Sequence, residues 1–144
     1  MRRSVEQLAF VQLQRTADRL QQAVAEFLKP YELSPTQFNA LRILRGAGAE
    51  GLPSGEIGTR LINKDPDITR LLDRLEKRGL VKRGRGVEDR RQVVARLTPA
   101  GQRLLAKLDE PIQAHHRETL GHLKAGELKE LIRLLQAAGE SFSG

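Results

Sequence analysis

The chain has 144 residues with 25 Lys or Arg against 18 Asp or Glu, a formal net charge of +7. It contains no cysteine, which excludes disulfides, thiolate metal sites and thiol-based redox sensing. No apolar run approaches the roughly 20 residues that span a bilayer, and polar residues interrupt any signal-peptide core, so we expect one cytoplasmic domain without membrane contact.

Two helices are predicted in the first third of the chain. Apolar residues spaced three or four apart indicate a long amphipathic helix over residues 5–29. Pro30 ends it, because proline disfavours helical geometry in the residue before it. The second helix begins with an N-cap, a first-turn proline and a capping-box glutamine, within the run Ser34, Pro35, Thr36 and Gln37. It stops at Gly46–Gly48.

Two further helices follow in tandem. Pro53 opens a short third helix with Ile57 and Leu61 inward. For the fourth helix we expect Asp65 as N-cap and Pro66 at the first helical position. Its apolar stripe lies at i, i+3, i+4 and i+7 and consists of Ile68, Leu71, Leu72 and Leu75. A glycine stop follows at Gly79.

A β-hairpin is predicted next. Residues 80–83 and 92–97 read as short strands, with Val93, Ala95 and Leu97 alternating against Val94 and Arg96. The eight residues 84–91 between them form a polar tip.

The chain ends in two more predicted helices. Thr98 and Pro99 repeat the cap-plus-proline signature and start a fifth helix, in which Pro111 should bend the axis or interrupt its hydrogen bonding. The joint at residues 121–126 precedes a last helix with Leu128, Leu131, Ile132 and Leu135 inward.

This order predicts a mainly α fold: a winged helix-turn-helix of three short helices plus a β-hairpin wing, flanked by long terminal helices. We expect a single domain over residues 1–144, with the winged lobe at 34–98. The helices at 5–29 and 100–142 have more apolar positions than one small lobe can cover. They are therefore expected to be dimerisation helices of a two-fold homodimer.

Positive charge is concentrated on the fourth helix and the hairpin. Residues 70–96 contain ten Lys or Arg and four Asp or Glu, a net charge of +6, so the rest of the chain carries about +1. A helix sized for the major groove beside a basic loop sized for the minor groove indicates binding to double-stranded DNA.

These residues resemble the MarR family of bacterial transcription regulators. The resemblance rests on three stretches: residues 68–81, Asp89-Arg90-Arg91, and Leu97-Thr98-Pro99-Ala100-Gly101. It implies an obligate two-fold dimer, a palindromic operator, and in most members release of DNA when a small molecule or oxidant is sensed. Together with the basic surface it predicts a sequence-specific transcriptional regulator, a repressor, with a small-molecule effector as a further partner.

The fourth helix supplies the first candidate DNA contacts. Arg70 faces away from the apolar stripe and suits bidentate hydrogen bonds to a guanine edge, although an intrahelical pair with Asp67 or Asp73 is the alternative. Thr69 suits a phosphate or a thymine methyl group. Arg74 and Lys77 share that face, with neighbouring acids offering competing roles.

The hairpin tip supplies the remaining candidates: Arg85, Asp89, Arg90 and Arg91. Within the family pattern, Arg91 is expected to enter the minor groove, with Asp89 orienting it through a charge-assisted hydrogen bond. The alternative is that the acidic residues merely neutralise their neighbours at a disordered tip.

One departure from the family concerns the start of the fourth helix, the reading helix that would contact the bases. Asp65 and Asp67 stand where such proteins more often carry Ser, Thr or Lys. Carboxylates stabilise a helix N-terminus but repel nearby phosphates, so base preference there stays open. Ser34, Thr36 and Gln37 are read as plain capping residues, with phosphate binding at that helix N-terminus as the alternative.

No cofactor or metal is expected. The three histidines have no companions at tight ligand spacing and are assigned to a surface or dimer interface: His115, His116 and His122. The effector pocket that the resemblance implies would involve Phe10, Leu13, Phe38 and Leu41, although apolar residues at helical spacing are more often core.

Two other functions were weighed. A protein- or RNA-binding winged helix is compatible with the fold, but only four Phe and one Tyr are available for base stacking, with no Trp. An enzyme lacks any nucleophile–base pair or phosphate-binding loop, so catalysis is not expected.

Overall fold

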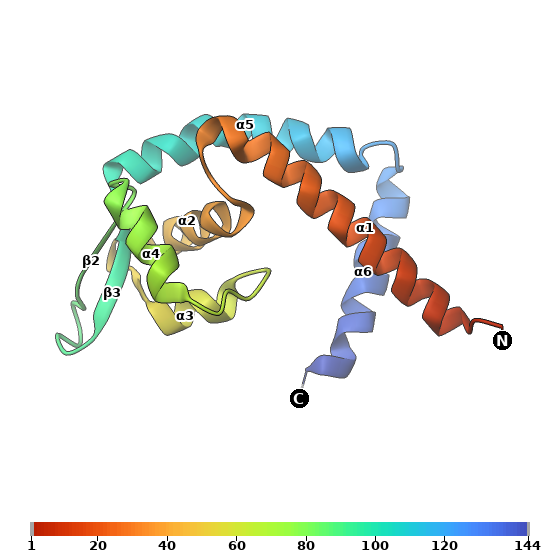
Figure 1. Cartoon of the computed structure of the whole chain (residues 1–144), viewed down its shortest axis with the longest axis horizontal. Coiled ribbons are helices and arrows are strands. Elements are labelled where there is room, and N and C mark those ends of the chain that lie inside the picture. Colours follow the sequence, from red (N-terminus) through yellow and green to blue (C-terminus); the bar gives the residue numbers. More distant parts are fainter. Residues whose placement is uncertain (1, 144) are drawn as a thin grey trace. The chain divides into compact units, whose positions relative to one another are not determined.

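A computed structural model of the chain describes residues 2–143, and Figure 1 labels its helices and the strands β2 and β3. The described chain forms the helices α1 (Val5–Leu28), α2 (Pro35–Ala47), α3 (Ser54–Arg60), α4 (Ile68–Lys77), α5 (Pro99–Leu120) and α6 (Ala125–Gly139). The strands are β1 (Leu52–Pro53), β2 (Val81–Arg85) and β3 (Val93–Leu97), and three single 3-10 turns are η1 (Lys29–Tyr31), η2 (Gly48–Glu50) and η3 (Glu140–Phe142). Two compact units meet between Glu110 and Pro111. The fold is mainly α with a winged helix-turn-helix, as predicted.

The predicted ends of α1 and α2 are confirmed. Helix α1 ends at Leu28, and Pro30 lies in the 3-10 turn that follows. At the start of α2 the Ser34 hydroxyl accepts the Gln37 N–H at 3.1 Å, and the Gln37 side chain accepts the Ser34 N–H at 3.0 Å. This reciprocal pair satisfies two donors that a helix start otherwise leaves unbonded.

The start of α4 differs from the prediction. Asp67, not Asp65, is the N-cap, and its carboxylate accepts the Arg70 N–H at 2.9 Å. Asp65 instead accepts the Asp67 N–H at 2.8 Å, so it forms a local turn before the helix. Pro66 therefore lies in the turn rather than at the first helical position. A proline also disfavours helical geometry in the residue before it, here Asp65, so the helix begins after the proline.

The end of α4 is set by Gly79, as predicted. Its φ is +73°, a conformation that glycine adopts without strain. The Leu80 N–H donates to the Leu75 carbonyl at 3.0 Å, and the Gly79 N–H donates to the Glu76 carbonyl at 2.9 Å. This pair of bonds is the Schellman motif, and it directs the chain from α4 into β2.

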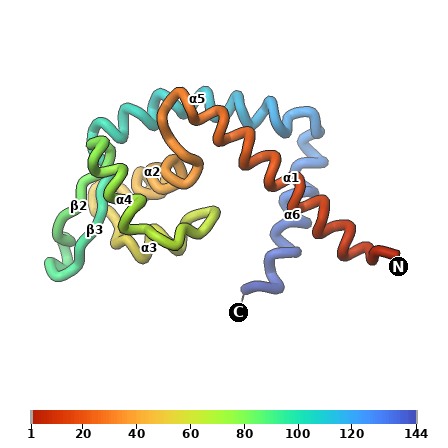
Figure 2. Tube along the Cα trace, in the orientation of Figure 1, coloured from red at the N-terminus to blue at the C-terminus, as the bar shows by residue number. Residues whose placement is uncertain are grey.

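The sheet has three antiparallel strands in the order β1-β3-β2. β1 was not predicted: Leu52 pairs with Ala95 and Pro53 with Val94. The hairpin is also longer than expected, because Gly84 and Arg85 pair with β3 and belong to β2. Figure 2 traces β2 and β3 side by side up to the tip at residues 86–92.

The burial pattern of β3 also corrects the expected alternation. Val94 and Ala95 are both buried, whereas Val93 is 53% exposed. β3 is the central strand and pairs with β1 only at Val94 and Ala95, so Val93 lies beyond the reach of β1.

Nearly all buried side chains belong to the first unit, mostly on α1, α2, α3, α4, the sheet and the first part of α5. Its largest fully buried side chains are Leu28, Leu41, Leu44, Ile57, Leu72, Leu75, Leu105, Leu108 and Val81. Thr98 ties the start of α5 to the end of α4, because its hydroxyl donates to the Gly79 carbonyl at 2.6 Å. An ion pair from Arg45 to Asp109, at 2.9 Å, joins α2 to α5. The Thr98 contact therefore keeps the end of β3 next to the end of α4.

The second unit consists of the rest of α5 and of α6. Helix α5 runs without a break through Pro111, so the expected interruption does not end it. No residue of α6 is buried. Ile132 and Leu135, which were predicted to face inward, are 54% and 44% exposed.

Candidate nucleic-acid interface

One face of α4 presents exposed side chains for which the described residues provide no partner. Thr69, Arg70, Arg74 and Lys77 are all exposed. Within residues 2–143, none of these four side chains takes part in a hydrogen bond or ion pair. The intrahelical pair weighed as an alternative for Arg70 is not observed. All four are therefore free to contact a ligand.

The acids of α4 are engaged elsewhere. Asp73 and Glu76 both accept from the Arg83 side chain of β2, Glu76 at 3.1 Å. Glu76 also accepts the Arg83 backbone N–H at 2.8 Å. These bonds favour the charged forms, so the pKa of Glu76 is lowered and that of Arg83 is raised.

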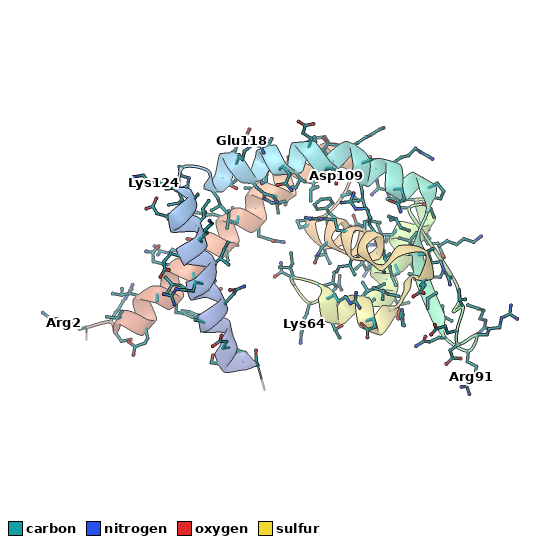
Figure 3. The ribbon with its side chains drawn as sticks, turned by 180° about the vertical axis from the view of Figure 1, so that it is seen from behind. Arg2, Lys64, Arg91, Asp109, Glu118 and Lys124 are labelled. Carbon is teal, nitrogen blue, oxygen red and sulfur yellow. The ribbon has the colours of Figure 1, made fainter. Side chains whose placement is uncertain are left out.

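Arg91 lies at the end of the wing and is 94% exposed (Figure 3). The carboxylate of Asp89 accepts the Arg91 backbone N–H at 3.0 Å and lies 3.4 Å from its side-chain Nε. This is the contact that the sequence predicted. The shorter of the two contacts fixes the backbone, and the side chain stays exposed.

The backbone of the tip is closed by two hydrogen bonds. The Gly86 N–H donates to the Gln92 carbonyl at 2.8 Å, and the Gln92 N–H donates to the Asp89 carbonyl at 3.1 Å. A Cβ on Gly86 would lie 2.6 Å from the Asp89 carbonyl oxygen. The tight turn therefore requires glycine, and it places Asp89 and Arg91 next to each other.

The other two wing arginines are exposed as well. Arg85 donates weakly to the Arg90 carbonyl at 3.5 Å, and the Arg90 side chain has no partner among the described residues. Together with Arg91 they make the wing tip strongly cationic.

Two arginines that support this interface were not singled out from the sequence. Arg83 holds the acids of α4, and Arg96 donates to the Ala49 carbonyl at 3.0 Å and to the Arg85 carbonyl at 3.1 Å. Arg83 of β2 and Arg96 of β3 lie on opposite faces of the hairpin. The sequence places both arginines in predicted strands, but it does not show their hydrogen-bond partners, which lie seven to 47 residues away along the chain.

A small hollow of about 90 Å³ lies between α4 and the sheet. It is lined by Ser54, Thr69, Leu72, Arg83, Val93, Val94 and Ala95. Thr69 thus stands at the border between the reading helix and the wing.

The remaining candidates take other positions. Phe38 and Leu41 are buried in the core, whereas Phe10 and Leu13 are 61% and 44% exposed on α1. Phe10 stands 18 residues before Leu28, about 27 Å along the helix. The effector pocket that would join these four side chains stays a prediction. His115 and His116 lie with ring centroids 6.0 Å apart. No described group of three or more His, Cys, Asp or Glu is placed to hold a metal ion. None of the helices between residues 2 and 143 has the length and apolar character needed to cross a membrane.

Comparison with known proteins decides the family. The MarR family model matches residues 33–93, which cover the winged lobe as far as the start of β3. The chain is 34% identical to the HTH-type transcriptional regulator YkoM of Bacillus subtilis, over 77% of this chain and 71% of that protein. The chain belongs to the MarR family. It is accordingly a DNA-binding transcriptional regulator and not an enzyme.

Solved MarR structures show the same fold over nearly the whole chain. A MarR transcription factor from Planctomyces limnophilus is 47% identical, with a TM-score of 0.71 over 95% of this chain and 99% of that one. An E. coli MarR mutant solved with operator DNA is 27% identical, with a TM-score of 0.78 over 88% of this chain and 89% of that one. CouR from Rhodococcus jostii, bound to p-coumaroyl-CoA, is 25% identical, with a TM-score of 0.80 over 95% of each chain.

Proposed function

We propose that this MarR family protein is a cytoplasmic homodimeric repressor. In this proposal each winged lobe binds one half-site of a palindromic operator, with Thr69, Arg70, Arg74 and Lys77 in the major groove and the wing arginines in the minor groove. The observation that carries it is the unpaired cationic face of α4 beside an Arg91 held by Asp89. The E. coli relative solved with operator DNA supports it.

Arg70 is assigned to a base edge. It stands in the first turn of α4, the end of a recognition helix that contacts bases, and its guanidinium matches the two acceptors of guanine. Arg70→Ala should weaken specific binding by roughly 1–3 kcal/mol and relax preference at one position of each half-site.

The binding test starts from genomic fragments captured by the purified protein and sequenced, which gives the operator. Affinities of wild type and Arg70→Ala are then measured on that operator and on single-base variants. Arg103→Ala is the matched control, because it loses the same charge and Arg103 is exposed on α5 with no salt-bridge partner among residues 2–143. If both variants lose affinity equally on every sequence, Arg70 does not read a base.

The homodimer rests on apolar surface that one chain leaves exposed. On α1 this surface comprises Val5, Leu8, Phe10 and Leu13, and on α6 it comprises Ile132, Leu134 and Leu135. Exposed apolar patches of this kind mark interaction sites. A sedimentation run that finds a stable monomer at micromolar concentration would refute the dimer, and deletion of residues 1–29 should give aggregated or unfolded protein.

We also propose that a small-molecule effector releases the DNA. Support comes from CouR, the relative bound to p-coumaroyl-CoA. An anionic aromatic or other amphipathic compound should favour a dimer in which the reading helices are wrongly spaced. Such compounds are titrated in an operator-shift assay. If every compound that binds leaves DNA affinity unchanged, the protein is a constitutive DNA binder.

A further inference from the structure

Arg83 of β2 forms ion pairs with two acids of α4, unlike the unpaired cations of that helix. The Arg83 guanidinium contacts both Asp73 and Glu76 of α4, and its backbone N–H donates to Glu76 at 2.8 Å. The Arg83 side chain is only 27% exposed, against 94% for Arg91. Arg83 is therefore turned toward the helix rather than toward solvent.

Without Arg83, those acids would have other partners. Asp73 stands four residues before Lys77 and three after Arg70, the spacings at which opposite charges meet on a helix. Elsewhere in this chain such spacings do form pairs: Glu26 with Lys29, Glu56 with Arg60, and Glu130 with Arg133. In α4 the corresponding pairs are absent, and the acid is bound by Arg83 instead.

We propose that Arg83 is a positioning residue for DNA binding. By holding Asp73 and Glu76, it keeps the cations of α4 unpaired and offsets two negative charges that would face the phosphates. It does this without itself reading a base. The inference rests on the proposed function, since it assigns α4 to the major groove.

The same contact joins the reading helix to the wing. Arg83 pairs with Ala95 in the β2–β3 ladder, while its side chain binds two successive turns of α4. Arg83 thus contacts the helix from the neighbouring strand of the wing.

The test compares operator affinities of variants at low salt. R83Q should bind at least about tenfold more weakly than wild type, because two like charges are then left beside the phosphates. Adding D73N and E76Q should restore affinity to within about threefold of wild type, because the acids that Arg83 held are gone. K82Q loses the same charge at the exposed neighbouring residue and should lose less affinity than R83Q.

A control of equal net charge excludes a simple charge effect. R83Q combined with E50Q and E88Q neutralises two exposed acids that no described residue pairs with. Under the proposal it stays weak although its net charge equals that of the rescued protein. Equal recovery by both triple variants would overturn the proposal.

Two further results also decide the matter. Failure of D73N and E76Q to restore the R83Q protein, with thermal unfolding unchanged, would show that Arg83 contacts DNA directly. The double variant D73N/E76Q, which retains Arg83, should bind the operator at least as tightly as wild type. A loss of operator affinity in this variant would overturn the inference, and this test holds even if the R83Q protein does not fold. A wild-type protein that binds no operator contradicts the proposed function itself, which is a distinct result.

Discussion

The contact between Asp89 and Arg91 allows a test in which two interpretations of Asp89 predict opposite changes in DNA affinity. Removing a carboxylate beside DNA should tighten binding if that carboxylate only repels phosphates. If Asp89 instead orients Arg91, Asp89→Ala should weaken binding. Glu88 is the matched control, because it is an exposed neighbouring acid without a partner among the described residues. We expect Glu88→Ala to leave affinity unchanged or raise it, and Asp89→Ala to lower it.

The size of the effect follows from the exposure of the pair. Arg91 is 94% exposed and Asp89 49%, so in the free protein the pair contributes between zero and about 1 kcal/mol, and the variants should fold normally. In the complex, each Arg91 that enters the minor groove releases about 0.9 of a counterion, or about 1.8 for two wings. Between about 50 and about 200 mM salt, wild-type affinity should therefore fall roughly tenfold more than that of Arg91→Ala.

The assay is fluorescence anisotropy on an operator duplex across that salt range. Arg91→Ala should bind most sequences more weakly, show the flatter salt dependence, and lose any A·T preference flanking the half-sites. Asp89→Ala should partly reproduce this behaviour. If Asp89→Ala tightens specific binding as Glu88→Ala does, Asp89 is only a repulsive charge and the reasoning about the wing is wrong.

Three further outcomes are expected. Gly86→Ala should distort the wing tip and weaken DNA binding in the same anisotropy assay, because its Cβ would lie 2.6 Å from the backbone oxygen of Asp89. Gly84→Ala is the control and should bind normally, because its Cβ would lie 3.7 Å from the flexible end of the Arg96 side chain. Ser34→Ala should lower the free energy of unfolding by roughly 1 kcal/mol in urea titrations, with operator specificity unchanged; a change of specificity would instead indicate a phosphate contact at α2. In the folded protein the pKa of Glu76 is lower than its ordinary value of 4.5. The charged carboxylate therefore contributes stability above pH 4.5, and this stability is lost as the pH falls through the lower pKa of the folded state. The Tm difference between wild type and Glu76→Gln should accordingly shrink below about pH 4.5. A difference that stays constant to about pH 3 would contradict that assignment.

The sequence by itself determined the helices, the cap that begins α2, the glycine that ends α4 and the position of the wing. Ser34 and Gln37 predicted the start of α2, and Gly79 predicted the end of α4, because these signals act within one turn of the chain. The apolar stripe of α4 likewise predicted its buried face, with Leu71, Leu72 and Leu75 all in the core.

Only the tertiary structure decided features that depend on contacts between distant segments. β1 has two residues, one of them a proline, and exists because β3 offers it a partner edge. The choice of Asp67 over Asp65 as N-cap is a local exception, because it depends on the turn that Asp65 forms with the Asp67 N–H around Pro66. Above all, the sequence offered Asp73 several cations, and the fold selected Arg83 ten residues away. Local patterns fix which residues lie on a face, whereas the pairing of charges on that face depends on which strand the fold places beside it.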